Sequence, residues 1–119
     1  MHSPYTFDTR LQLLDSMASG DLSFKQELID VYLRDLTQMK RQLSKAFSER
    51  DFVSLKRVFH TLKSNAKVLG SDSLSALCLV LEKASEGKDL KRVASLLPEF
   101  SSQVKMHERD LKKSIKGLS

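Results

Sequence analysis

Cysteine is almost absent from this sequence of 119 residues, which contains only Cys78. A single cysteine excludes an internal disulfide, and without a cluster of cysteine and histidine residues a structural zinc site is excluded as well. The inward carboxylates and Glu-x-x-His motifs with which helical bundles bind metals or cofactors are also missing. We therefore predict no metal, no cofactor and a reducing, cytoplasmic location. Cys78 itself is predicted to be a small buried residue of the core.

Long apolar runs and glycine-rich loops are missing too. No stretch approaches the roughly 18 apolar residues of a membrane span, and residues 1–10 lack the apolar region of a signal peptide. We therefore expect a soluble protein that does not contact membranes. No P-loop or other glycine-rich phosphate cradle is present, so the domain is not expected to phosphorylate itself from ATP.

Glycine and proline are scarce and stand at boundaries. The four glycines, at 20, 70, 87 and 117, lie where periodic apolar segments stop, and Pro98 is the only proline inside such a segment. No segment shows sustained alternation with period two. The pattern predicts an all-α chain that forms one domain over residues 1–119, with residues 1–6 flexible.

Apolar residues recur at three- and four-residue steps in five segments. A short helix is expected over residues 8–19. A long second helix begins at Ser23, whose side chain forms a capping box with Gln26, and ends near Ser48. Its predicted inner face consists of Phe24, Leu28, Val31, Tyr32, Met39, Leu43 and Ala46. A third helix is expected in the segment 51–70. Asp51 is its predicted N-cap, and Gly70 is predicted to lie just past its end.

Two further helices complete the chain. Ser71 or Asp72 caps the fourth, and Asp89 caps the last. The apolar period continues across Pro98, so the last segment is predicted to be one kinked helix, with His107 half-buried at the edge of its stripe. Four long helices with connections of two to four residues favour an antiparallel up-down-up-down four-helix bundle, with the short first helix added at one end.

The third helix carries both a core-facing stripe and the most distinctive chemistry. At about 100° per residue, its apolar residues fall within roughly 60° of Leu55, whereas His60 falls at about 140°. His60 is therefore predicted to be exposed at mid-helix, beside Lys56, Lys63 and Lys67. A lone exposed histidine is ordinarily part of a solvated polar face, but the surrounding lysines favour a functional residue.

The lysines beside His60 form a locally unfavourable patch unless an anion binds there. No carboxylate lies within one turn of His60 to form a catalytic triad, and no second histidine or cysteine lies three or four residues away to share a metal. The pattern thus indicates a solitary exposed nucleophile in a cationic frame.

This pattern resembles the histidine phosphotransfer (HPt) domain, the phosphoryl shuttle of multistep two-component signalling. The family's stretch reads roughly His-x-x-Lys-Gly, five variable residues and Gly, followed by a Leu-Glu pair near the end of the next helix. The matching positions here are His60, Lys63, Ser64, Gly70, Leu81 and Glu82. Ser64 departs from the pattern, because the family has glycine there to leave room for the incoming receiver domain. The resemblance covers nearly the whole chain.

The resemblance implies that His60 forms a phosphoramidate through the ring nitrogen distant from the backbone. The phosphoryl group would come from, or pass to, an aspartate of a receiver domain, which would also supply magnesium. Lys63 would neutralise the phosphoryl charge of about −1.5 to −2. The domain would thus be a phosphoryl carrier that acts without an ATP site of its own, as a monomer.

The remaining predicted site residues would contact the phosphoryl group or the partner. Lys56 and Lys67 would steer an acidic receiver surface, and Ser64 and Asn65 would donate hydrogen bonds to phosphoryl oxygens. Glu82 is expected to be a solvated or ion-paired charge.

Two alternatives remain open. A helical adaptor could bind receiver domains without phosphotransfer, which Ser64 favours. The net charge of +5 and the pI near 9.4 favour an acidic partner, and a basic nucleic-acid-binding bundle would be one answer. Acidic residues are dispersed among the basic ones and only eight residues are aromatic, so we predict no nucleic-acid binding.

Overall fold

The computed structural model describes the backbone of residues 22–116 and the side chains of residues 26–114. These residues form four helices and no strand: α2 (Leu22–Glu49), α3 (Phe52–Val68), α4 (Asp72–Glu86) and α5 (Leu90–Lys116). The prediction of an all-α chain with four long helices is confirmed for this part of the chain. The short helix predicted over residues 8–19 lies outside the described residues.

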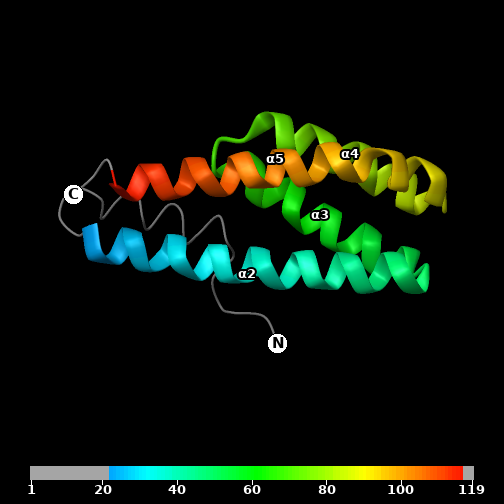
Figure 1. Ribbon diagram of the computed structural model, residues 1–119, viewed down its shortest axis with the longest axis horizontal. Coiled ribbons are helices and arrows are strands. Elements are labelled where there is room, and N and C mark those ends of the chain that lie inside the picture. The colour runs from blue at the N-terminus through cyan, green and yellow to red at the C-terminus, as the bar shows by residue number, and fades with distance from the viewer. Residues whose placement is uncertain (1–21, 117–119) are drawn as a thin grey trace.

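The two longest helices set the length of the bundle. In Figure 1, α2 and α5 run along the long axis, while α3 crosses the space between them obliquely. α3 packs against both α2 and α4, and α5 packs against α4 and α2. Two sides of α3 are therefore covered by helices, and a third side is left for solvent. None of the helices in residues 22–116 combines the length and the apolar character needed to cross a membrane.

Each of the three connections uses the same backbone motif at the end of the preceding helix. After α3, Gly70 has φ +85° and its N–H donates to Lys67 O at 3.1 Å, while Ser71 N–H donates to Ala66 O at 2.8 Å. These two bonds satisfy helix carbonyls that would otherwise lack partners. The predicted place of Gly70, just past the end of the helix, is confirmed.

The other two connections place a charged residue in the same left-handed position. Arg50 has φ 53° after α2, and Lys88 has φ 56° after α4. Gly87, which marks the end of α4 in the sequence, stands one residue before the left-handed position. A side chain with a Cβ is disfavoured in this conformation, so both sites are strained relative to glycine.

The starts of α3 and α5 agree with the sequence. Asp51 caps α3 by accepting from Ser54 N at 3.1 Å, and Asp89 accepts from Arg92 N at 3.1 Å at the start of α5. For α2, the side chain of Ser23 lies outside the described side chains, so its predicted capping box with Gln26 stays a prediction. Pro98 lies within the continuous helix α5, as predicted.

The core face of α2 is shifted relative to the prediction. Its buried apolar residues are Ile29, Tyr32, Leu36, Met39, Leu43 and Ala46. They alternate strictly between three- and four-residue steps, which keeps one narrow stripe facing the neighbouring helices. The predicted set started on a different stripe at Leu28 and Val31, which are only partly buried, and therefore omitted Ile29 and Leu36.

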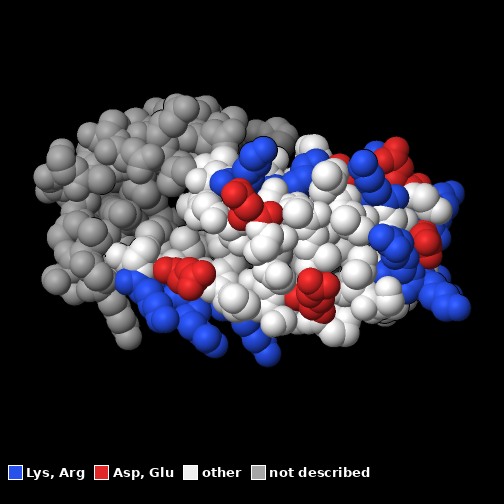
Figure 2. All heavy atoms as spheres, turned by 90° about the horizontal axis from the view of Figure 1, so that it is seen from above, with Lys and Arg blue, Asp and Glu red and all other residues white. Residues whose placement is uncertain are grey.

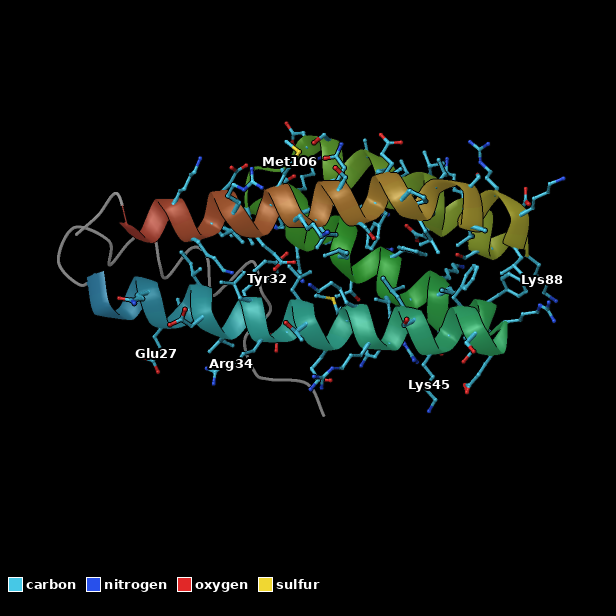
Figure 3. All side chains as sticks on the ribbon, in the orientation of Figure 1. Glu27, Tyr32, Arg34, Lys45, Lys88 and Met106 are labelled. Atoms are coloured by element: carbon cyan, nitrogen blue, oxygen red, sulfur yellow. The ribbon has the colours of Figure 1, made fainter. Side chains whose placement is uncertain are left out.

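His107 is a second departure, because it is buried rather than half-buried, with 3% of its surface exposed. Its Nε2 lies 2.9 Å from the hydroxyl of Tyr32, and the two rings meet edge to face. In Figure 3, Tyr32 points from α2 into the space between α2 and α5, whereas Glu27, Arg34 and Lys45 point away from the bundle. A hydrogen bond within the core compensates the cost of burying an imidazole.

Candidate functional site

His60 lies at the middle of α3 on the side that faces solvent, with 60% of its side chain exposed. The core side of α3 consists of Leu55, Val58, Phe59, Leu62 and Ala66. Phe59 is fully buried and stacks edge to face with Phe100 of α5, which fixes the rotation of α3 about its axis. The prediction that His60 is exposed at the middle of the helix is therefore confirmed.

A carboxylate from α4 joins His60 to Lys63. His60 Nδ1 lies 2.8 Å from Glu82 Oε2, and Lys63 Nζ donates to Glu82 Oε1 at 2.7 Å. The Glu82 side chain is only 12% exposed, whereas Lys63 is partly exposed. One carboxylate thus uses both of its oxygens to hold two side chains that lie one turn apart on α3.

The ionisation of Glu82 determines which nitrogen of a neutral His60 ring carries the proton. Burial by itself would raise the pKa of Glu82, but hydrogen bonds from Lys63 and His60 and their positive charge hold that pKa below its usual value. Glu82 is therefore an ionised carboxylate near neutral pH and can only accept hydrogen bonds. His60 Nδ1 must then donate, which fixes the tautomer of the neutral ring.

The fixed tautomer leaves the lone pair of neutral His60 on Nε2. No hydrogen bond from residues 22–116 reaches Nε2, and the ring is well exposed. An imidazole nitrogen with a free lone pair is a nucleophile, and a carboxylate on the other nitrogen stabilises the positive charge that the ring acquires when Nε2 forms a bond. The arrangement can therefore carry an electrophilic group on Nε2.

A buried serine holds α3 and α4 together next to this cluster. Ser75 Oγ donates to the backbone carbonyl of Lys63 at 2.9 Å, and Ser75 itself is buried. Ser75 lies seven residues before Glu82, which places both on one face of α4. The sequence analysis did not single out Ser75. Its only sequence signal is a small polar residue two turns before Glu82 at the edge of an apolar stripe.

The other predicted site residues surround the cluster without joining it. Lys56 forms an exposed ion pair with Glu86 of α4, with 3.7 Å between Nζ and Oε1. Ser64 and Lys67 are exposed, and Asn65 is partly buried. Within residues 22–116, the side chains of these three residues make no hydrogen bond, so they are available to a ligand.

Glu82 corrects two expectations from the sequence. No carboxylate lies within one turn of His60 along α3, but the fold brings one from 22 residues away. The lysine patch also is not left uncompensated, since Glu82 neutralises Lys63 and Glu86 pairs with Lys56. The expectation that Glu82 is ion-paired is confirmed, but the residue is largely buried rather than solvated.

Comparison with known families identifies the class of this domain. The family model for the Hpt domain matches residues 27–113, which include most of α2 and α5 and all of α3 and α4. The chain belongs to the Hpt domain family. Hpt domains are phosphoryl carriers of two-component phosphorelays that interact with receiver domains and have no ATP site of their own. No curated protein and no solved structure matches the chain.

The charged residues of this Hpt domain are interspersed on the face drawn in Figure 2. In the face shown in Figure 2, Lys and Arg side chains form several separate groups, with acidic and uncharged surface between them. This face does not carry the continuous basic stripe that is typical of nucleic-acid-binding domains. Among residues 22–116, no group of three or more His, Cys, Asp or Glu residues is placed to hold a metal ion.

Proposed function

We propose that His60 is the phosphoacceptor of this Hpt domain and exchanges a phosphoryl group with receiver-domain aspartates. The observation that carries the proposal is the hydrogen bond of 2.8 Å between His60 Nδ1 and Glu82, which leaves Nε2 of an exposed ring free. In the forward step the Nε2 lone pair attacks phosphorus, and the bond from phosphorus to the aspartyl oxygen breaks. The aspartate leaves as a carboxylate, and the Nδ1 proton stays on the ring.

Glu82 and Lys63 stabilise two different charges in this step. Phosphorylation of Nε2 gives the ring a positive charge, which the Glu82 carboxylate stabilises through Nδ1–H. Lys63 Nζ is held by Glu82 one turn from His60 and supplies positive charge beside the phosphoryl oxygens. The reverse step uses the same contacts, so the site serves transfer in both directions.

The remaining polar residues assist at the periphery. Ser64 is exposed one turn after His60, and its hydroxyl together with the Asn65 amide can donate to phosphoryl oxygens. Lys67 and Lys56 attract the acidic surface of the receiver domain. The connections over residues 50–51, 69–71 and 87–89 support an antiparallel up-down-up-down course of the four helices. The cytoplasmic location and the monomeric state stay predictions of the sequence.

Phosphotransfer from purified receiver domains tests the proposal. Receiver domains of the source organism are phosphorylated with acetyl phosphate and mixed with the wild-type protein and with His60→Gln. We expect at least one receiver to label the wild type with a group that is labile to acid and stable to base, and none to label His60→Gln. Labelling of the variant at the wild-type rate would exclude His60 as the acceptor.

One residue favours a second function. Ser64 stands at the position where the family's glycine gives the receiver domain access to the histidine. If receiver domains bind the wild type but none of them labels it, the domain is an adaptor without phosphotransfer. Recovery of labelling in Ser64→Gly would then identify the serine as the cause.

A further inference from the structure

Three large apolar side chains are exposed among the described residues: Val53 (76%), Leu79 (39%) and Met106 (54%). Single exposed apolar residues are common on protein surfaces and need no explanation by themselves. Val53 and Leu79, however, are on α3 and α4, the two helices that form the site, whereas Met106 is on α5, a helix that contributes no residue to the site.

Val53 lies on the same stripe of α3 as His60. It precedes His60 by seven residues, so it lies two turns away, about 10.5 Å along the axis and only about 20° around it. Position 53 is in the first turn of α3, where the Asp51 cap fixes the backbone. The side chain is therefore held in a defined place and still points into solvent.

Leu79 approaches His60 from the other helix. It precedes Glu82 by one turn of α4 and follows Ser75 by one turn, and both of these residues contact α3 at the site. The contacts between the helices run from Lys56–Glu86 through His60–Glu82 to Lys63–Ser75. This order places Leu79 beyond His60 on the side opposite Val53, so the two apolar residues lie about 15 Å apart along the helices with the histidine between them.

The polar centre of this surface carries one positive charge that is not paired. Lys63 is paired with Glu82, whereas Lys67, seven residues after His60 on the same side of α3, is exposed and makes no ion pair within the described side chains. A ligand that fits must therefore present a negatively charged centre to His60 and apolar groups at its edges. Interfaces commonly obtain their affinity from a few such apolar anchors, while charged residues set the association rate.

We propose that Val53 and Leu79 are the two apolar anchors on which a phosphorylated receiver domain docks. This inference rests on the proposed function and assigns the receiver an acidic phospho-aspartate pocket with aliphatic side chains on two sides. The anchors determine which receiver binds and how tightly it binds, whereas His60, Lys63 and Glu82 act on the phosphoryl group.

Three matched substitutions test the assignment. Val53→Gln, Leu79→Gln and Met106→Gln each replace an exposed apolar side chain by an uncharged helix former, and the last is the control. In Figure 3, Met106 points outward from α5, away from α2. For each protein the dissociation constant for isolated receiver domains, phosphorylated with acetyl phosphate, is measured by calorimetry at low and high salt. The rate of phosphoryl transfer at saturating receiver is measured alongside.

The expected result separates affinity from chemistry. Each substitution removes apolar area that the receiver would bury on binding. Binding is therefore expected to weaken about tenfold for Val53→Gln and about fivefold for Leu79→Gln, whose side chain is less exposed. The double variant is expected to lose about fiftyfold, because the two sites are far enough apart to be additive. Binding by Met106→Gln and the transfer rate at saturation are expected to match the wild type, and the loss should persist at high salt, unlike the effect of a lysine substitution.

Two results would overturn the assignment. If the wild type is labelled at His60 but Val53→Gln and Leu79→Gln bind the receiver as tightly as Met106→Gln does, the anchors are elsewhere and the proposed function stands. If the variants lower the saturated transfer rate and leave the dissociation constant unchanged, Val53 and Leu79 act on the chemistry and not on docking. A wild type that binds the receiver without being labelled refutes the proposed function alone, because the affinity comparison can still be made.

Discussion

The two described histidines of this Hpt domain, His60 and His107, differ in their exposure and in their hydrogen-bond partners. His60 is 60% exposed and is held through Nδ1 by a carboxylate, whereas His107 is 3% exposed and is held through Nε2 by the hydroxyl of Tyr32. The carboxylate orients its ring and leaves the other nitrogen to solvent. The tyrosine instead satisfies a ring that is enclosed between α2 and α5, and it leaves no access for a reactant.

Under the proposed function, the hydrogen-bond partner and the burial of each ring therefore distinguish the phosphoacceptor histidine from the structural one. An ionised acceptor such as Glu82 stabilises positive charge on the ring, which suits a residue that acquires charge during transfer. Burial lowers the pKa of His107, although Asp110 and Glu108 act in the opposite direction, so this ring is kept neutral. The comparison can be tested at each of its contacts.

The largest expected effect is the loss of phosphotransfer in His60→Gln. Glutamine can accept or donate a hydrogen bond but has no nucleophilic nitrogen, so labelling should fall below detection. The side chain lies outside the core, so the midpoint of urea unfolding should change little. A variant that loses helicity together with labelling would show that His60 also supports the fold.

Glu82→Gln should retain labelling at a rate about a hundredfold lower, within the range that general acid–base partners contribute. The amide keeps a similar shape but loses the charge that stabilises the phosphorylated ring, and it no longer fixes the His60 tautomer. The rate is measured at saturating receiver. A rate within threefold of the wild type would mean that the hydrogen bond between His60 and Glu82 does not act in the transfer.

His107→Ala should behave in the opposite way, with transfer retained and stability reduced. Removing the ring leaves a cavity and takes one partner from the buried Tyr32 hydroxyl, which together cost about 3 kcal/mol. Urea denaturation at neutral pH measures this loss, and His60→Ala serves as the matched control at an exposed position. Equal stabilities of the two variants would contradict the structural role of His107.

These contrasts also show what the sequence alone could predict. The exposure of His60, the Asp51 and Asp89 caps and the left-handed Gly70 depend on neighbours within a few residues, so periodicity and residue type were sufficient. Glu82 and Tyr32 meet their histidines across 22 and 75 residues. Such contacts depend on how the helices pack, so Glu82 was expected to be solvated or ion-paired and His107 half-buried. Arg50 and Lys88 were missed because arginine and lysine rarely take a left-handed conformation.

The two sites should also respond to different ranges of pH. Because the folded pKa of His107 lies below its ordinary value of 6.5, the unfolded chain binds more protons as the pH falls below 6.5, and stability decreases there. Glu82 contributes stability above its ordinary pKa of 4.5, which is lost at lower pH as the folded carboxylate is protonated. Urea unfolding from pH 8 to 4 should therefore show a decline between pH 6.5 and 4.5 that is absent in His107→Gln, whereas the decline below pH 4.5 should remain in the variant. An identical decline in the variant would assign it to other groups.

The smallest expected effect concerns Ser64, one turn after His60. The serine adds a hydroxymethyl group beside the phosphoryl group, where it can obstruct the receiver domain or donate a hydrogen bond to a phosphoryl oxygen. Since the side chain is small and exposed, these opposed effects should nearly cancel, and Ser64→Gly should change the transfer rate by less than about tenfold, or 1.4 kcal/mol of barrier. The glycine should also destabilise α3 by about 0.5 to 1 kcal/mol, which urea unfolding measures separately. A much faster glycine variant would mean that access to Nε2, and not the Glu82 contact that distinguishes His60 from His107, limits the reactivity of this histidine.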